Sequence, residues 1–143
     1  MHFRMFMRRF CAFMIDNLIL GVAAWALQYF IVSNMDIDVF KLLLFYIFLS
    51  VAYFALQEYS PAHATIGKRI MNLVVCNMEY KDITLVQAFG RNLVRIFNYF
   101  IYSVGYIPIL FTKREQGLHD LIARTVVVDR EELEEFWAEQ EEE

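Results

Sequence analysis

An arginine and an aspartate stand out in the first apolar stretch of the chain because of their spacing. Asp16 and its neighbour Asn17 lie about two helical turns inside an otherwise apolar run, and Arg9 lies just before that run. Arg9 and Asp16 are close to two turns apart, so the two side chains share one face of a helix. A carboxylate costs roughly 2.5 to 3.5 kcal/mol near a bilayer centre, and such groups usually pair with bases or relay ions and protons. We therefore predict a buried ion pair, in which Asp16 either exchanges an ion or proton or only holds helices in register.

A second group of charged residues lies in the C-terminal half of the chain. Gln87, Arg91, Arg95 and Asn98 recur at i, i+4, i+8 and i+11, which makes a polar stripe on an apolar helix. Two interpretations stay open. The stripe faces lipid headgroups, or its arginines face the interior and pair with acids. We assign seven residues to a candidate charge network, and they are Arg9, Asp16, Asn17, Arg91, Arg95, His119 and Asp120.

The sequence carries no pattern that indicates catalysis. It has no GxSxG, HExxH, CxxC or Walker motif, and its three histidines are scattered. The segment Thr65-Ile66-Gly67-Lys68 resembles the end of a phosphate-binding loop but lacks the upstream glycine and the preceding strand. Cys11 and Cys76 lie far apart and outside any CxxC motif, so we expect two apolar fillers and no disulfide. We expect no enzyme activity, no cofactor and no metal site.

The composition is that of a membrane protein. Of the 143 residues 59% are hydrophobic, which is too apolar for an ordinary soluble domain. The net charge of −4 hides an uneven distribution, because residues 131–143 contain eight Glu and no Lys or Arg. Residues 1–130 therefore hold 13 basic and 9 acidic residues, and we assign them to a single membrane domain followed by an acidic tail. A mildly basic body suits an anionic leaflet and gives no reason to expect nucleic acid binding.

Two stretches are long enough to cross a bilayer. The spans are predicted at about 10–33 and 39–56, and the short acidic loop between them makes them an antiparallel hairpin. Basic residues precede the first span and follow the second, so the positive-inside rule places the N-terminus and residues 58–92 in the cytoplasm. A cleaved signal peptide ending at Ala24-Trp25-Ala26 is the alternative, although Asp16 and Asn17 interrupt its apolar region.

The rest of the chain predicts shorter elements. The runs 70–76 and 125–129 read as two strands that pair with each other on the cytoplasmic side. A capping box formed by Thr84 and Gln87 predicts a helix that starts at Leu85. A third apolar segment, 96–111, is short and interrupted by Gly105 and Pro108, so it either re-enters the membrane from one side or spans it. The tail, helical or disordered, is a candidate site for a protein partner.

Four fragments in order resemble the RDD family of small bacterial membrane proteins, named for an arginine and two aspartates. They extend over roughly residues 8–129 and read Arg9-x-x-Ala12-x-x-x-Asp16, then Thr65-x-Gly67-Lys68-Arg69, Arg91-Asn92-x-x-Arg95, and Gly117-Leu118-His119-Asp120. The resemblance makes Arg9, Asp16 and Asp120 the name-giving residues and Thr65, Gly67 and Lys68 part of a cytoplasmic motif. Transport, including sodium/proton exchange, has been proposed for some members of that family.

The expected fold is an all-α protein of the bacterial inner membrane. It consists of a hairpin of two transmembrane helices, a third short or re-entrant apolar segment, and a small cytoplasmic pair of β-strands. The expected function is movement of ions or small solutes, with Asp16 as the titrating group. One copy has too few spans to enclose a pathway, so transport requires a homo-oligomer in the lipid bilayer. The alternative is a membrane adaptor or assembly protein whose charge network is purely structural and whose acidic tail meets a protein partner.

Overall fold

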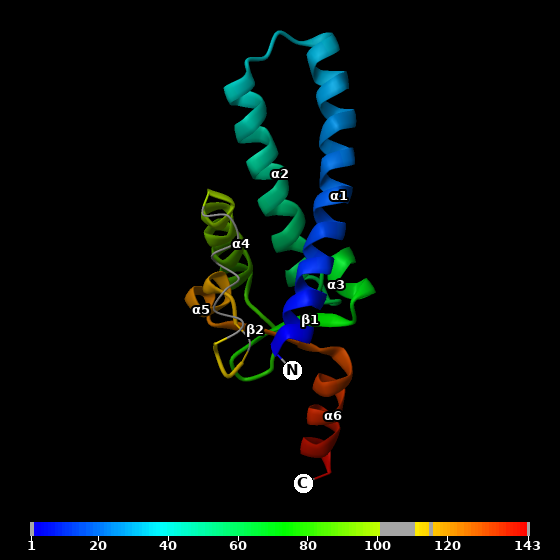
Figure 1. Ribbon diagram of the computed structural model, residues 1–143, viewed down its shortest axis with the longest axis vertical. Helices are drawn as coiled ribbons and strands as arrows, with labels where there is room; N and C mark the ends of the chain where they lie inside the picture. The colour runs from blue at the N-terminus through cyan, green and yellow to red at the C-terminus, as the bar shows by residue number, and fades with distance from the viewer. Residues whose placement is uncertain (1, 101–110, 115, 143) are drawn as a thin grey trace.

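A long antiparallel pair of helices dominates the computed structural model, which describes residues 2–100, 111–114 and 116–142. Helix α1 (His2–Asn34) and helix α2 (Val39–Tyr59) rise side by side and meet at the acidic loop, far from both termini (Figure 1). The Asp38 side chain caps α2 by accepting a hydrogen bond of 2.9 Å from the Lys41 backbone N–H. The predicted hairpin is therefore present, and its helices extend beyond the predicted spans at their ends away from the loop.

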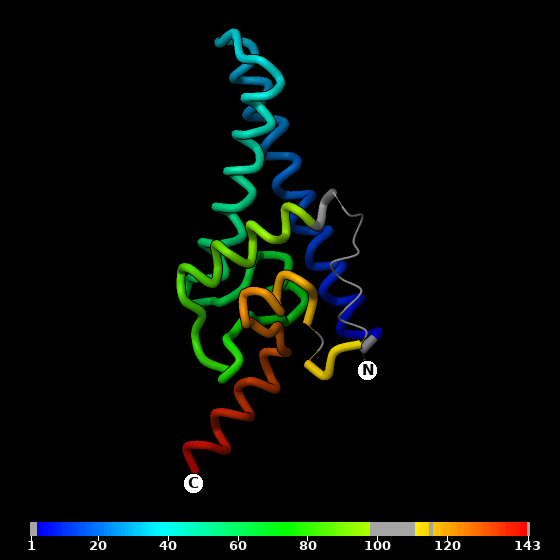
Figure 2. Tube along the Cα trace, turned by 90° about the vertical axis from the view of Figure 1, so that its left-hand side faces the viewer, coloured from blue at the N-terminus to red at the C-terminus, as the bar shows by residue number. Residues whose placement is uncertain are grey.

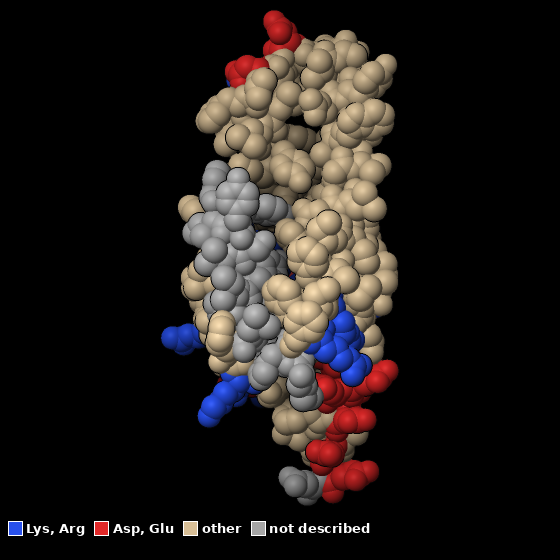
Figure 3. All heavy atoms as spheres, in the orientation of Figure 1, with Lys and Arg blue, Asp and Glu red and all other residues tan. Residues whose placement is uncertain are grey.

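Both hairpin helices are long and apolar enough to cross a membrane. Only 17% of the residues in the most apolar window of α1 and 22% in that of α2 are buried within the chain. The remaining apolar side chains need another apolar phase, which a bilayer supplies. In Figure 3 the charged side chains gather at the two ends of the molecule, with a long uncharged band between them.

The other elements form a cap at the end of the hairpin away from the loop. The cap consists of α3 (Ile66–Ile70), β1 (Leu73–Asn77), α4 (Leu85–Phe100), α5 (Leu118–Ala123), β2 (Thr125–Asp129) and α6 (Arg130–Glu141). Helix α3 packs on α1, α4 packs on α2, and α5 packs on α4. Figure 2 shows α4 beside the lower part of the hairpin and α6 extending away from it.

The two predicted strands pair with each other. Strands β1 and β2 are antiparallel, and Val75 lies opposite Val127 at the centre of the ladder. Their inner side chains pack with residues of α2 and α4 in a small apolar core that includes Ala55 and Ala88. The first strand begins at Leu73 and not at residue 70 as predicted. The preceding residues form α3, and Asn72 takes a left-handed conformation (φ 56°) that turns the chain into the strand.

The capping box also forms as predicted. The Thr84 N–H donates to Gln87 Oε1 (3.0 Å), and the Gln87 N–H donates to Thr84 Oγ1 (3.2 Å), so α4 begins at Leu85. Helix α4 continues to Phe100, and residues 101–110 lie outside the described part of the chain. Both paths for the segment 96–111 therefore stay predictions.

The acidic tail is helical where it is described. Helix α6 starts directly after β2, and Asp129 caps it by accepting a hydrogen bond from the Glu131 N–H. The Phe136 ring lies 5.0 Å from the Tyr80 ring and 5.6 Å from the Trp137 ring, measured between centroids. Phe136 of α6 therefore contacts the turn that follows β1.

Removing the cap of α4 tests this assignment. The Thr84→Ala variant loses the side-chain acceptor at an exposed helix start, so we expect the free energy of unfolding to fall by about 1 kcal/mol. Thermal unfolding in detergent measures the change. Thr84→Ser keeps the acceptor and should remain close to the unsubstituted protein, whereas equal stability of all three proteins would contradict the cap.

Candidate functional site

Seven charged side chains lie buried together where the cap meets the hairpin. Each is at most 6% exposed, and they come from α1, α2, α3, α4 and α5. We call this set the charge cluster, and its members are Arg9, Asp16, Glu58, Lys68, Arg91, Arg95 and Asp120.

Asp120 joins the first span to the cap. Its carboxylate forms ion pairs with Arg9 of α1 and with Arg91 of α4, where the Nε–Oδ1 distance is 2.7 Å. The Gly117 N–H donates a hydrogen bond of 3.0 Å to the same carboxylate at the start of α5. Burial alone favours the neutral acid, but the two guanidinium groups outweigh it and hold the pKa of Asp120 well below its usual range.

His119 lies beside this carboxylate and is fully buried. Its Nε2 is 3.4 Å from Asp120 Oδ1. Burial lowers the pKa of His119 well below its ordinary value; Asp120 opposes that shift, and the arginines Arg95, Arg91 and Arg9 add to it. The imidazole is therefore neutral at physiological pH and adds no charge to the cluster.

Glu58 is another buried acid of the charge cluster, and it was not predicted from the sequence. Its carboxylate forms ion pairs with Lys68, with Arg91 (Nη1–Oε1 2.8 Å) and with Arg95 (Nη2–Oε1 3.6 Å). It also accepts a hydrogen bond of 3.0 Å from the Asn92 amide. The predicted second span ended at residue 56, which left Glu58 in a connecting segment. A signal was present, because the predicted charge network held three arginines against only two acids.

Lys68 is nearly as buried as its partner Glu58. Burial, and then the neighbouring Arg91, lower its pKa to about 7, and Glu58 acts in the opposite direction. Among the four basic side chains of the charge cluster, Lys68 is therefore the one that loses its proton most readily.

Asp16 is held by neutral donors. Its carboxylate accepts hydrogen bonds from the Thr65 hydroxyl (2.5 Å), the Gly67 N–H (2.9 Å) and the Tyr53 hydroxyl (3.0 Å). We predicted an ion pair between Arg9 and Asp16, but the ion pair described for Arg9 is the one with Asp120. Helix α3, which was not predicted from the sequence, brings its own donors to Asp16.

Gly67 makes this contact geometrically feasible. A Cβ atom at Gly67 would lie 2.1 Å from the backbone oxygen of Ala12 and 2.9 Å from Asp16 Oδ2. No larger residue lets α3 approach α1 so closely. The predicted motif of Thr65, Gly67 and Lys68 therefore belongs to the charge cluster, since Thr65 and Gly67 bind Asp16 and Lys68 binds Glu58.

The polar face of α4 is turned inward, as one of the two interpretations predicted. Arg91 is fully buried, and Arg95 is 4% exposed with its guanidinium 4.5 Å from the centre of the Phe54 ring. The side chain of Asn98 is outside the described part of the structure. The amide of Asn17 donates to the Phe13 carbonyl in its own helix (2.8 Å), which is an ordinary contact within α1.

A small cavity lies inside the charge cluster. It measures about 10 Å³, and the residues that line it are Arg9, Phe13, Asp16, Phe54, Lys68, Arg91, Arg95 and His119. The Nε of Arg95 is buried and has no hydrogen-bond partner among the described residues. Within the same residues, no three His, Cys, Asp or Glu side chains converge as metal ligands.

A family model and a relative from Bacillus subtilis each match most of this chain. The sequence model of the RDD family matches residues 4–124, a range that contains the whole charge cluster. The chain is 28% identical over 141 residues to the uncharacterized protein YxaI of Bacillus subtilis (strain 168), covering 84% of this chain and 93% of that protein. No solved structure matches the chain.

A methyl group at Gly67 tests the contact between α1 and α3. Gly67→Ala must push α3 away from Ala12 and Asp16, so we expect a loss of about 1–3 kcal/mol in stability. Gly90→Ala is the matched control. Gly90 lies inside α4, and a Cβ atom there would meet no other atom within 4 Å, so this substitution should stabilise the fold by about 0.4–1 kcal/mol. Equal effects of the two substitutions in a thermal unfolding assay would contradict the close approach.

The pH dependence of stability tests Asp120. Its lowered native pKa means that the ionised form stabilises the fold above the usual aspartate pKa of about 3.9, and that this contribution disappears as the pH falls further. Asp120→Asn leaves buried guanidinium groups without their acid and should cost about 3–5 kcal/mol at pH 7. The stability gap to the unsubstituted protein should narrow below about pH 4. The exposed Asp82→Asn serves as a control, and a gap independent of pH would contradict the assignment.

Proposed function

This chain belongs to the RDD family, and from that premise we propose that it moves small ions or solutes across the bacterial cytoplasmic membrane as a homo-oligomer. In this proposal the charge cluster lies at the inner boundary of the bilayer and forms the polar part of the pathway. In the same proposal, the two apolar helices α1 and α2 anchor the protein in the membrane.

The distribution of charge supports an orientation with both described ends in the cytoplasm. The loop between α1 and α2 carries Asp36 and Asp38, whereas Arg4, Arg8 and Arg9 occupy the first turns of α1 at the other end. Basic residues remain preferentially on the cytoplasmic side of a bacterial membrane. The cap, which is attached at the arginine end of the hairpin, is then cytoplasmic.

The unsatisfied Nε of Arg95 carries the proposal of ion movement. Charged groups in or beside a membrane span are costly, and they often mark ion pathways or proton relays. A network that served only as a clamp would gain stability by satisfying every buried donor. Arg95 instead lies beside a cavity with one donor atom unused among the described residues.

The hairpin itself supports an oligomer. Its two helices separate towards the loop and leave a cavity of about 290 Å³, lined mostly by apolar side chains together with Gln28 and Tyr46. One copy contributes two candidate spans from its described residues, which is too few to surround a pathway. Helices of neighbouring copies would cover this apolar surface.

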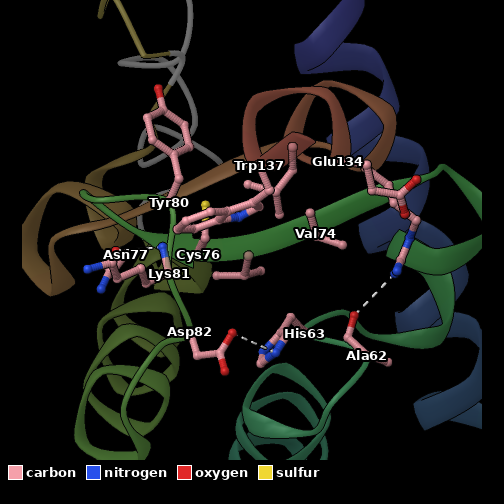
Figure 4. Close-up of a pocket in the computed structure, with 13 residues that line it drawn as sticks. Ala62, His63, Val74, Cys76, Asn77, Tyr80, Lys81, Asp82, Glu134 and Trp137 are labelled. Carbon is pink, nitrogen blue, oxygen red and sulfur yellow. Dashed lines mark hydrogen bonds and ion pairs between the residues drawn. The ribbon is translucent and has the colours of Figure 1, made fainter. Parts of the chain in front are cut away.

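Helix α6 favours a second candidate function, that of a membrane adaptor. A cavity of about 650 Å³ lies between β1 and α6, with Trp137 and Glu134 on one side and His63 and Asp82 on the other (Figure 4). His63 Nε2 is 3.1 Å from Asp82 Oδ1, and Arg130 donates a hydrogen bond of 3.2 Å to the Ala62 carbonyl. An aromatic and acidic helix beside an open cavity is suited to binding a protein partner.

Ion flux through proteoliposomes tests the leading proposal. The purified protein should carry sodium-, proton- or anion-driven flux, and Asp16→Asn should reduce it because the amide cannot accept all the hydrogen bonds that the carboxylate accepts. Asp36→Asn, in the exposed loop, is the matched control and should leave flux unchanged.

The outcomes separate the two candidates. Flux that Asp16→Asn leaves unchanged, in a variant that elutes as a folded protein, defeats the role of Asp16. Absence of flux with every ion tested defeats transport and leaves the adaptor as the better candidate.

A further inference from the structure

The charge cluster contains more positive than negative groups among the residues that the structure describes. Its bases are Arg9, Lys68, Arg91 and Arg95, and its acids are Asp16, Glu58 and Asp120. His119 is neutral, and the other polar neighbours, such as Thr65 and Asn92, carry no charge. Among the described residues, four buried bases thus face three buried acids, an excess of one positive charge.

The excess positive charge borders the small cavity. All four bases line it, whereas only one of the three acids, Asp16, does so. The oxygens of Asp16 already accept hydrogen bonds from Tyr53, Thr65 and Gly67. The cavity is therefore surrounded mainly by donors, and Arg95, which lines it, has a buried Nε without a hydrogen-bond partner among the described residues.

An uncompensated charge in such a place is unstable. Taking an ion out of water costs several kcal/mol, and an ion pair left with an extra charge does not recover that cost. The charge must be removed either by loss of a proton or by gain of a counter-ion. A sodium ion would add to the positive charge and would find the Asp16 oxygens occupied by donors. The site therefore disfavours cations.

We propose that the cavity binds one small monovalent anion, a halide, with Arg95 Nε as a donor and the surrounding bases as its counter-charge. A volume of about 10 Å³ holds a single particle of about the size of a water molecule. Fluoride fits that space directly, and chloride or bromide requires a small outward shift of the flexible arginine and lysine side chains. This inference deepens the proposed function, since it names the sign and size of the ion at the same site.

Anion binding should depend on pH through Lys68. The groups that face its ammonium are Glu58, Arg91 and Arg95, and the low pKa of about 7 means that Lys68 loses its charge near neutrality. The excess positive charge then disappears. Because a proton on Lys68 favours the anion, halide affinity should fall as the pH rises from about 6 to about 8. His119 does not contribute to this change, because its pKa lies well below that range.

Halide titration of the full chain in detergent tests the inference. The melting temperature should rise with fluoride, chloride or bromide at constant ionic strength, with gluconate as the balancing anion that is too large for the cavity. Arg95→Gln removes the positive charge of the guanidinium group and should raise the half-saturating halide concentration about tenfold or more. Arg124→Gln, at an exposed arginine, is the matched control and should leave that concentration unchanged.

The unsubstituted protein decides the question if Arg95→Gln does not fold. In crystals grown with bromide, the anomalous signal should place an ion in the cavity within hydrogen-bond distance of Arg95 Nε. A water molecule there, or equal stabilisation by halide and gluconate, overturns the site. Halide binding without any flux leaves the site standing and defeats transport. Flux without halide binding supports transport and defeats the anion site.

Discussion

The fold depends on burying several charged side chains where the cap meets the hairpin. Such burial is tolerable only if the charged groups form ion pairs and hydrogen bonds with one another. Asp120 shows how the chain meets this condition, because its carboxylate is shared by Arg9 of α1 and Arg91 of α4. Arg91 also reaches Glu58 of α2, so that one arginine connects α4 to the hairpin and to α5. Removing any one partner leaves the others buried without compensation, so the hairpin and the cap must form together. Apolar packing between α1 and α2 alone does not impose such a requirement.

Much of this fold was predictable because local signals agreed with the final structure. Length and hydropathy identified the two hairpin helices, the Thr84 and Gln87 pair identified the start of α4, and β-branched runs identified the two strands. Such signals depend on residues close together in the sequence, and tertiary contacts did not override them.

The contacts that were not predicted from the sequence depend on which distant residues meet. Arg9 and Asp16 share a helix face, yet each takes its partners from a different element of the cap, Arg9 from α5 and Asp16 from α3. Glu58 went unnoticed because its role appears only when Lys68 and Arg91 converge on it from two other elements. A spacing rule finds neighbours on one helix but not the partners that the topology supplies.

Asp129 has a further consequence for the mechanics of the molecule. Its carboxylate caps α6, pairs with Arg8 in the second turn of α1, and accepts a hydrogen bond of 3.2 Å from Asn72. Within the described residues, Asp129 thus links the start of α6 to α1, which is long and apolar enough to cross a membrane. A displacement of α6 therefore acts on α1 through Asp129, and on the cap through the Arg130–Ala62 hydrogen bond and the contact between Phe136 and Tyr80.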